Sequence, residues 1–517
     1  MKVASLGHAG LRVETARATL LIDPWFSPEG AFQASWFQYP DNSHLLEPEL
    51  FSPTAILISQ GRMDHFDPWF LARVPATVPV VVPRYPSSAL RRKIELAGAW
   101  PVVEVAAWKP CEVAEGVTVF FVPEDSPMNH DSAIVLMAGE RTLLNLNDAR
   151  LSPLQLRTIR ERAGGVIDVF AFQGAGASWY PMCYRYDNER KREKAHQKRL
   201  AKLSYVARSI GVLAPVTAVP FAGPPCFLDP EIFQRNAEMD GGILPDQEQV
   251  AGWLRGRGLD NVAVLLPGDV WDVEAEAKEP DPVWDGFSFE ERWPYLEAYA
   301  ARRRPQVKAV RARFPQPDDR LWDEFQEYFQ RLLGMSPYFN RKIGMRVGFE
   351  VTGPGGGSWA VDFGDGCQAV LPELGDCGYV FTMASRWLRP ILREEVPWED
   401  FLLSLRFEAQ RSPDVPNDHL LGLLKYADQD SLAAVERFET SMASEQRITV
   451  HAAGQAYSVA RYCPHAGNDL EETGDVLPGG VLRCLAHHYE FDLATGRCLN
   501  GSGLTLDVEP LEASPSH

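Results

Sequence analysis

The chain has 517 residues, of which 45% are hydrophobic and 23% charged, and its formal net charge is −19. This length corresponds to about three domains of ordinary size, and no apolar run approaches the ~20 residues that cross a bilayer. The negative charge argues against a nucleic-acid partner, whose binding needs clustered cations, but it leaves room for a small anionic substrate. The first residues enter a strand-like pattern without a signal-peptide segment, which predicts a cytoplasmic protein with no membrane partner.

Residues 1–278 form the first predicted domain. Short β-rich runs alternate with turns, as at Leu11–Glu14 and Val117–Val122, and helical patterns interleave with them, as at Pro153–Arg162. This alternation predicts an α/β domain with a largely antiparallel start. The acidic, proline-containing stretch Val270–Pro282 predicts its end.

Three further segments follow in chain order. Residues 279–340 are predicted to be a helical connector, whose aromatic residues recur at helical spacing as a core stripe does. Residues 341–435 are predicted to be a smaller α/β domain, with the Gly-rich segment Gly353–Gly357 connecting two strands of a hairpin. Residues 440–517 show only short strands and turns. The predicted fold class is therefore α/β plus all-β.

Two Cys-His pairs stand out in the last segment, Cys463-Pro-His465 and Cys484-Leu-Ala-His487. Two hairpin loops that each offer one thiolate and one imidazole can hold a 2Fe-2S cluster, with the thiolates on one iron and the imidazoles on the other. A structural zinc site is the main alternative, but it would place its His residues together, whereas here Cys and His alternate. His488 also follows Cys484, but the Cys-X-X-His spacing selects His487.

The surroundings of these pairs resemble Rieske ferredoxins and Rieske oxygenases over about residues 445–512. The resemblance rests on Ala466-Gly467 after the first pair and on the run His488-Tyr489-Glu490-Phe491-Asp492 after the second. It implies a Rieske-type 2Fe-2S cluster and a ferredoxin or reductase as electron donor. The respiratory-complex type carries an extra Cys in each loop, and this sequence has none there, so the oxygenase or ferredoxin type is the better match.

Three N-terminal runs stand out: Gly7-His8-Ala9-Gly10, Leu21-Ile22-Asp23-Pro24-Trp25 and Ser59-Gln60-Gly61-Arg62-Met63-Asp64-His65-Phe66-Asp67. They resemble the metallo-β-lactamase fold, which implies an αββα sandwich with metals at loop ends. In the family motif His-X-His-X-Asp-His, Gln60 and Arg62 stand in place of the first two His. An amide is a poor ligand for a transition metal and a guanidinium is none at all, so we expect the first metal site to be lost.

The second metal site of that family could survive. Asp64 and His65 are retained, and Asp148 falls where the resemblance places the bridging Asp. A further His, either His130 or His8, would make the set similar to a non-haem iron site. For both His residues a structural role, such as capping a turn, is an equal alternative.

Five further runs belong together: Asp131-Ser132-Ala133, Leu144–Asp148, Pro220-Phe-Ala-Gly-Pro224, Trp398-Glu-Asp400 and Ser404-Leu-Arg-Phe407. With them, most of the chain resembles the cytidine-monophospho-N-acetylneuraminate hydroxylases and their bacterial relatives. In that family a Rieske domain is joined to a metallo-β-lactamase-like domain, and the enzyme carries out an iron- and oxygen-dependent hydroxylation. Two features depart from it, the C-terminal place of the Cys-His pairs and the degraded His motif, and both leave the substrate open.

The middle segment, near residues 345–425, resembles a sterol-carrier-like domain. The residues that carry this resemblance are Phe349-Glu-Val-Thr and Ser358-Trp-Ala-Val-Asp362. The resemblance implies a lid over the active site or a binding partner for it.

Two functional hypotheses follow. In the first, the protein is a Rieske-type oxygenase that uses O2 to hydroxylate or N-oxygenate a small molecule, with Asp64, His65 and Asp148 as catalytic iron ligands and His130 as a weaker addition. In the second, it is an electron-transfer or redox protein with a metal-free lactamase-like scaffold. A hydrolase is the weakest alternative, because its bridging hydroxide needs both metal ions. Electron transfer could also run between protomers of a homo-oligomer.

Overall fold

The computed structural model describes residues 1–176, 178–364, 368–441, 446–465, 467–485, 488–501 and 503–511. Two compact units emerge. Unit 1 comprises Met1–Glu124, His130–Pro315 and Asp400–Arg406, and unit 2 comprises Asp125–Asn129, Gln316–Glu399 and Phe407–His517. The segment expected to be a helical connector is divided between them, with α6 (Arg292–Ala312) in unit 1 and both α7 (Trp322–Leu333) and α8 (Pro337–Ile343) in unit 2. The other predicted domain boundaries stay predictions.

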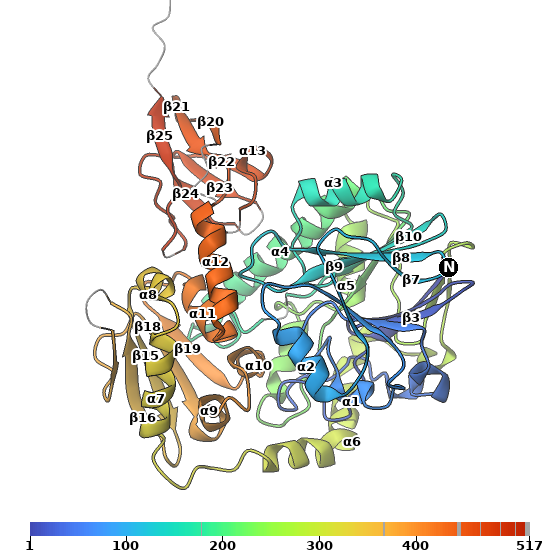
Figure 1. Cartoon of the computed structure of the whole chain (residues 1–517), viewed down its shortest axis with the longest axis horizontal. Coiled ribbons are helices and arrows are strands. Elements are labelled where there is room, and N and C mark those ends of the chain that lie inside the picture. The colour runs from blue at the N-terminus through green and yellow to red at the C-terminus, as the bar shows by residue number, and fades with distance from the viewer. Residues whose placement is uncertain are drawn as a thin grey trace, which may run out of the picture. The chain divides into compact units, whose positions relative to one another are not determined.

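Unit 1 contains two sheets, drawn mostly in blue and teal in Figure 1. The first has eight strands, in which β3 to β6 are parallel and the remaining pairs antiparallel. Its order is β14 (Ala277–Glu279), β13 (Val270–Asp272), β1 (Lys2–Gly7), β2 (Gly10–Glu14), β3 (Thr19–Ile22), β4 (Ala55–Leu57), β5 (Val80–Pro83), β6 (Val102–Val105). The second has six strands, in the order β12 (Thr217–Phe221), β11 (Val169–Gln173), β10 (Arg141–Asn145), β9 (Ser132–Ala138), β8 (Val117–Pro123), β7 (Cys111–Ala114).

The two sheets pack face to face because apolar side chains on one face of each sheet point toward the other sheet. In β8, Val119 and Phe121 point into a core shared with Leu11 and Leu57 of the first sheet. Successive side chains of a strand point to opposite faces, so the residues between them, such as Phe120, pack on the outer side. The shared core therefore lies between the sheets, where it stabilises both.

Helices cover the outer faces of this sandwich. Leu156, Leu203 and Leu254 place α3 (Pro153–Arg162), α4 (Asn188–Leu213) and α5 (Gln247–Arg255) on the second sheet. Phe70 and Ile94 place α1 (Pro68–Leu71) and α2 (Ala89–Ala97) on the first. The αββα sandwich is thereby confirmed. Short 3-10 helices lie at Ser43–Leu45, Pro48–Phe51, Phe233–Met239, Pro282–Trp284 and Phe289–Glu291.

Unit 2 begins with a five-stranded sheet. Its order is β17 (Ala369–Leu371), β16 (Gly357–Asp362), β15 (Arg346–Thr352), β18 (Tyr379–Ala384), β19 (Phe407–Arg411), and the Gly-rich segment connects β15 to β16 as predicted. Aromatic rings form its core: Phe325 of α7 packs on Trp359 with centroids 4.8 Å apart, and Phe349 stacks on Phe381. Its other helices are α9 (Ser385–Leu392), α10 (Trp398–Leu403), which crosses into unit 1, α11 (Asp418–Tyr426) and α12 (Gln429–Ser441).

The last part of unit 2 is built mainly from short strands, as the sequence predicts, and these strands form two three-stranded sheets. One has the order β20 (Arg447–Ala452), β21 (Gln455–Ala460), β25 (Val508–Leu511), and the other the order β22 (Gly474–Leu477), β23 (Val481–Cys484), β24 (Glu490–Asp492). The helix α13 (Leu470–Thr473) precedes β22. Val459, Leu482, Phe491 and the thiols of Cys463 and Cys484 share one small core.

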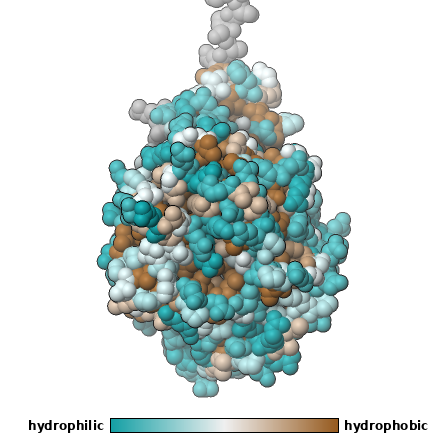
Figure 2. Space-filling model, turned by 90° about the vertical axis from the view of Figure 1, so that its right-hand side faces the viewer, coloured by the Kyte–Doolittle hydropathy of each residue, from teal (hydrophilic) through white to brown (hydrophobic). Residues whose placement is uncertain are grey.

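Across the part of the chain that the structure describes, no helix is both long and apolar enough to traverse a bilayer. The face shown in Figure 2 is covered mostly by hydrophilic residues, with hydrophobic ones scattered among them.

Candidate functional site

Four strand ends of unit 1 bring polar residues together. His8 directly follows β1, Asp23 follows β3, and the segment that contains Asp64 and His65 follows β4. Asp148 comes shortly after β10 of the second sheet. Because β3 and β4 are parallel, with Ile22 beside Leu57, their carboxyl ends meet at one edge of the sheet.

The backbone is unusual at this edge. His8, Asp23 and Asn147 have φ angles of 46°, 43° and 51°. Residues other than glycine seldom adopt this left-handed region, and they do so mostly where the surroundings hold them in place, often at functional sites. The turn at each of the three strand ends therefore directs a particular side chain to a particular place.

Asp23 orients His65, which is fully buried. His65 Nδ1 lies 2.8 Å from Asp23 Oδ2 and donates to it, because a carboxylate can only accept. Ser59 holds the other side of Asp23 through its backbone N–H at 2.8 Å and its hydroxyl at 2.5 Å. With Nδ1 used in this way, the other ring nitrogen of His65 is directed away from Asp23 and into the site.

Two carboxylates face His65 Nε2. It lies 3.3 Å from Asp148 Oδ2 and 3.6 Å from Asp64 Oδ2. Burial alone would lower the pKa of His65, but Asp64 and Asp148 together raise it well above its usual value. A lone pair facing two anions requires a positive charge between them. That charge can be a proton on Nε2, or a metal ion that displaces it.

His8 completes the group. Its Nε2 is 3.0 Å from Asp64 Oδ2, and its ring packs edge-on against Trp25, with centroids 5.0 Å apart. The ligand atoms of His8, Asp64 and His65 all lie within 4.8 Å of one another. Burial acts to raise the pKa of Asp64, but His65 and His8 hold it below its ordinary value.

The donor set fits a divalent metal. Asp64 Oδ1 and His8 Nδ1 are buried and make no hydrogen bond with any residue that the structure describes, so each retains coordinating capacity. Two imidazoles and two carboxylates, counting Asp148, are the ligand types that ferrous iron accepts. His8, Asp64, His65 and Asp148 would hold such an ion, and Asp23 would fix the orientation of His65 from outside the ligand set.

His130 does not join this group. Its ring stacks on Tyr85 at a centroid separation of 4.9 Å, and the Tyr85 hydroxyl donates to the Ser59 carbonyl at 2.7 Å. The sequence could not decide whether His8 or His130 is the further ligand. In the structure His8 lies beside Asp64 and His65.

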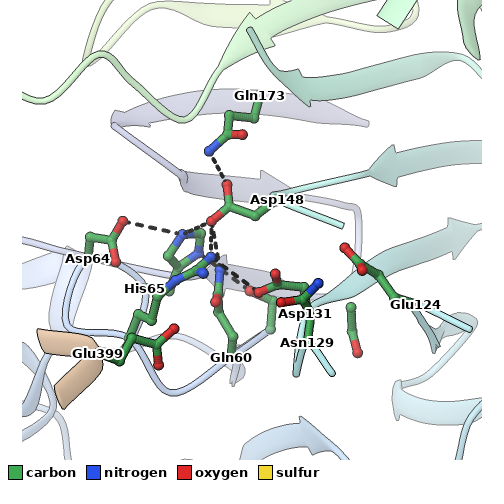
Figure 3. Close-up of polar contacts among 12 residues, drawn as sticks. Gln60, Asp64, His65, Glu124, Asn129, Asp131, Asp148, Gln173 and Glu399 are labelled. Atoms are coloured by element: carbon green, nitrogen blue, oxygen red, sulfur yellow. Dashed lines mark hydrogen bonds and ion pairs between the residues drawn. The ribbon is translucent and has the colours of Figure 1, made fainter. Parts of the chain in front are cut away.

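Gln60 and Arg62 both donate to Asp148 Oδ2, the oxygen that also faces His65. Figure 3 shows Gln60 directed toward Asp148. Arg62 Nη2 donates to Asp148 Oδ2 and also lies 3.2 Å from Asp131 Oδ1. Gln60 Nε2 donates to Asp148 at 3.1 Å, and Gln173 Nε2 donates to its second oxygen. Burial acts to raise the pKa of Asp148, but Arg62 and His65 hold it well below its ordinary value. A guanidinium thus supplies positive charge beside a carboxylate that the sequence predicts as a metal ligand.

The predicted cluster ligands lie in two loops of one shape. The backbone N–H of Cys463 donates to the carbonyl of Asn468 at 2.8 Å, and that of Cys484 to Tyr489 at 2.8 Å. Each Cys carbonyl also accepts from the residue four places on, Gly467 at 2.8 Å and His488 at 2.7 Å. Those two residues share a left-handed conformation, with φ of 66° and 62°. The two loops therefore present their Cys side chains in the same way, and both Cys residues are buried.

The three predicted ligands that the structure describes, Cys463, His465 and Cys484, offer donor types that fit the cluster. His465 lies in the first loop, with its ring centroid 4.5 Å from that of Tyr489 in the second. Its Nε2 is 3.4 Å from Asp418 Oδ2, which also accepts a hydrogen bond from the Tyr489 hydroxyl. His487, the fourth predicted ligand, lies outside the described residues. Cys463, His465 and Cys484 remain the ligands that we predict beside it.

The residues that support both sites were not predicted from the sequence. Asp23 lies in the run Leu21–Trp25, but nothing in that run indicates its contact with His65. Asn500 braces the second loop, since its Nδ2 donates to the His488 carbonyl and its Oδ1 accepts from the Glu490 N–H. Asp418 lies far from the Cys-His pairs in the chain. No local spacing points to any of these contacts.

Comparison with known proteins places these features in a family. The model of the Rieske [2Fe-2S] domain matches residues 423–505. A protein of Mycolicibacterium smegmatis that is named as a Rieske 2Fe-2S iron-sulfur protein is 31% identical over 99% of this chain and 100% of its own length. One of Mycobacterium tuberculosis with the same description is 30% identical over 97% of this chain and 98% of its own.

Among solved structures, the first half of the chain is similar to Igni18, a metallo hydrolase from Ignicoccus hospitalis. The identity is 16%, the match covers 52% of this chain and 96% of that one, and the TM-score is 0.36. CmlA, a diiron β-hydroxylase from Streptomyces venezuelae, is 18% identical over 54% of each chain, with a TM-score of 0.35. Similarity this low says nothing about chemistry, which has to follow from the residues themselves.

Proposed function

Because the chain belongs to the family of Rieske 2Fe-2S iron-sulfur proteins, we propose that it is an oxidoreductase of the oxygenase type. Its substrate would be a small molecule that is hydroxylated or N-oxygenated with O2, and its electrons would come from a ferredoxin or reductase. A bound Rieske cluster supplies one-electron transfer, and a non-haem iron held in unit 1 supplies oxygen activation.

The observation that carries this proposal is the convergence of His8, Asp64, His65 and Asp148. These residues come from strand ends of both sheets, and their facing carboxylates and imidazole require a positive charge between them. A scaffold without function would have no need to collect two buried His and two carboxylates in this way. A mononuclear iron meets the requirement with the donor types that it prefers.

Arg62 favours one metal ion over two. A two-metal hydrolase holds a hydroxide between its ions, and here the Arg62 guanidinium and the Gln60 amide both donate to Asp148 Oδ2. Because these two residues replace two His ligands and the guanidinium is a cation, a second divalent ion beside them would meet repulsion and few ligands. A hydrolytic function of the two-metal kind is therefore disfavoured.

An electron-transfer protein with a metal-free unit 1 is the second candidate. The ion pairs of Asp148 with Arg62 and of Asp64 with His8 and His65 favour it, because protonated His65 could balance the carboxylates without any metal. The two candidates differ in one measurable quantity, the number of irons in each chain.

Iron content of anaerobically purified protein tests the proposal. Wild type should hold three irons per chain, two in the cluster and one in unit 1. His65→Ala and His8→Ala should hold two and keep the low average g of a reduced Rieske cluster in electron paramagnetic resonance. His130→Ala is the matched control and should keep all three. A wild-type value of two, unchanged in His65→Ala, would establish the electron-transfer function instead.

A further inference from the structure

The helix α4 carries a stripe of lysines on its inner side. Lys191, Lys194, Lys198 and Lys202 recur at helical spacing, so they share one face. Lys191 Nζ donates to the Met182 carbonyl at 3.0 Å. Lys198 Nζ donates to the Tyr180 carbonyl at 2.8 Å. The loop before α4 thus covers the first three positions, and the last is left over.

Lys202 has no such partner. Only 8% of the residue is exposed, and among the residues that the structure describes none accepts a hydrogen bond from its ammonium group or lies within ion-pair distance of it. Buried polar groups nearly always have a partner, and the exceptions call for an explanation such as a bound ligand or ion. A lysine carries three N–H donors, so Lys202 retains three and Lys198 two.

The position of Lys202 is defined by its neighbours. Three residues further along α4, the Tyr205 hydroxyl accepts from the Leu151 N–H at 2.7 Å and donates to the Leu151 carbonyl at 3.1 Å. This contact fastens α4 to the segment that carries Asp148. The Lys202 ammonium is close enough to Asp148 to take part in lowering the pKa of that carboxyl group.

Two further cations lie near Lys202. Lys198 stands one helical turn before it on α4, and the contact of Tyr205 with Leu151 brings the neighbouring Arg150 to this helix. Burial lowers the pKa of Lys198 to about 7 and that of Lys202 to about 8, and Arg150 acts in the same direction. The carboxylates nearby bond elsewhere: Asp148 and Asp131 contact Arg62, and Glu124 accepts from the Arg150 backbone N–H. None of these three carboxylates accepts a hydrogen bond from Lys202, so its donors are available to an external anion.

We propose that Lys202 and Lys198 of α4, with Arg150, form a subsite that binds an anionic oxygen group of the substrate, a carboxylate or a phosphate or sulfate ester. The proposal rests on the proposed function in that it names the substrate class. Binding to the subsite does not require the iron, because none of its three residues is a candidate iron ligand. An anion held there would lie beside Asp148 and so fix one end of the substrate next to the oxygen-activating centre.

Inorganic sulfate and acetate are suitable probes, because both keep their charge between pH 6 and 9. The thermal unfolding midpoint of the full chain is followed against each anion, with chloride at equal ionic strength as reference. Wild type should show a saturable rise. Lys202→Gln should weaken the apparent affinity by about tenfold or more, as expected for the loss of a charge-assisted hydrogen bond. Lys202→Arg keeps the charge and should retain binding. A response to acetate stronger than that to sulfate would identify the group as a carboxylate.

Arg192→Gln is the matched control. Arg192 is exposed on the same helix, so this variant loses one positive charge without touching the subsite and should bind sulfate as wild type does. His65→Ala should also bind sulfate, even when its unit 1 holds no iron, which separates failure of this inference from failure of the proposed function. The inference is overturned if wild type shows no saturable response, or if Lys202→Gln and wild type respond alike.

Discussion

Asp23 Oδ2 lies 2.8 Å from His65 Nδ1 in a pair whose two side chains are wholly inaccessible to solvent. The pair determines which nitrogen of His65 faces the site, because the nitrogen that donates to a carboxylate cannot also bind a metal. Carboxylate partners of this kind orient metal-binding His residues and increase their basicity. The candidate iron site thus depends on a residue that would never touch the iron.

Asp23→Asn tests this dependence. The amide keeps the size of the side chain but loses the charge that holds His65 in place, so affinity for the third iron should fall by about 10- to 100-fold. Iron titration of the full chain measures the affinity, and the Rieske resonance signal should be unchanged. Asp131→Asn removes a nearby carboxylate that does not contact His65 and should have a much smaller effect. Equal losses in both variants would contradict an orienting role for Asp23.

The second prediction concerns the register of the cluster ligands. His487→Ala should abolish the cluster, because it removes an imidazole from one iron and opens that iron to solvent. His488→Ala should leave the cluster assembled, because the variant keeps the backbone N–H that donates to the Cys484 carbonyl at 2.7 Å. Visible absorbance and iron content check both variants. Loss of the cluster in His488→Ala with retention in His487→Ala would show that the ligand pairing is wrong.

Asn500→Ala should weaken the second cluster loop. The side chain makes one hydrogen bond to the His488 carbonyl at 2.8 Å and accepts another from the Glu490 N–H at 2.9 Å. Leaving these backbone groups without partners should cost about 1–3 kcal/mol, so the cluster should be lost at lower temperature, as followed by visible circular dichroism. Gln455→Ala removes a half-buried amide that donates to the Ala456 and Leu511 carbonyls, outside both cluster loops, and should leave that temperature unchanged.

Acid should reveal a contact that ties three helices of unit 2 together. Glu439 of α12 lies 3.0 Å from His419 Nε2 of α11 and accepts from the Tyr338 hydroxyl of α8 at 2.5 Å. Burial acts to raise the pKa of Glu439, but His419 and Tyr338 hold it below the ordinary value of 4.5. A carboxyl group whose folded pKa is depressed stabilises the protein above its unfolded pKa, and this stabilisation is lost as pH falls through the folded pKa.

Glu439→Gln should therefore lower the thermal unfolding midpoint at neutral pH. The difference from wild type should persist down to about pH 5 and shrink below the unfolded pKa of a glutamate, about 4.3. Thermal unfolding of both proteins between pH 7 and pH 4 measures this. A difference that stays constant across the range would mean that packing, not charge, accounts for the effect.

The sequence by itself determined whatever depends on local spacing. Cys463 and His465 lie two positions apart, and Cys484 and His487 three, so each pair can be recognised as a two-ligand loop without knowing the rest of the fold. The sequence alone also shows that Gln60 and Arg62 stand at the two positions where the motif has His. A nearly continuous run of apolar residues, as in β8, likewise predicts a strand that is buried on both faces, because successive side chains point to opposite sides.

Only the tertiary structure decided which distant residues meet. The sequence could not choose between His8 and His130, because each lies at the end of a different strand. Which of the two lies near Asp64 depends on the order of the strands in the sheets. The contacts of Asp23 with His65 and Arg62 with Asp148, and the placement of Lys202 beside that same Asp148, depend in the same way on which strands and helices are neighbours. Such convergence is set by the packing of a whole domain, and no window of local sequence contains it.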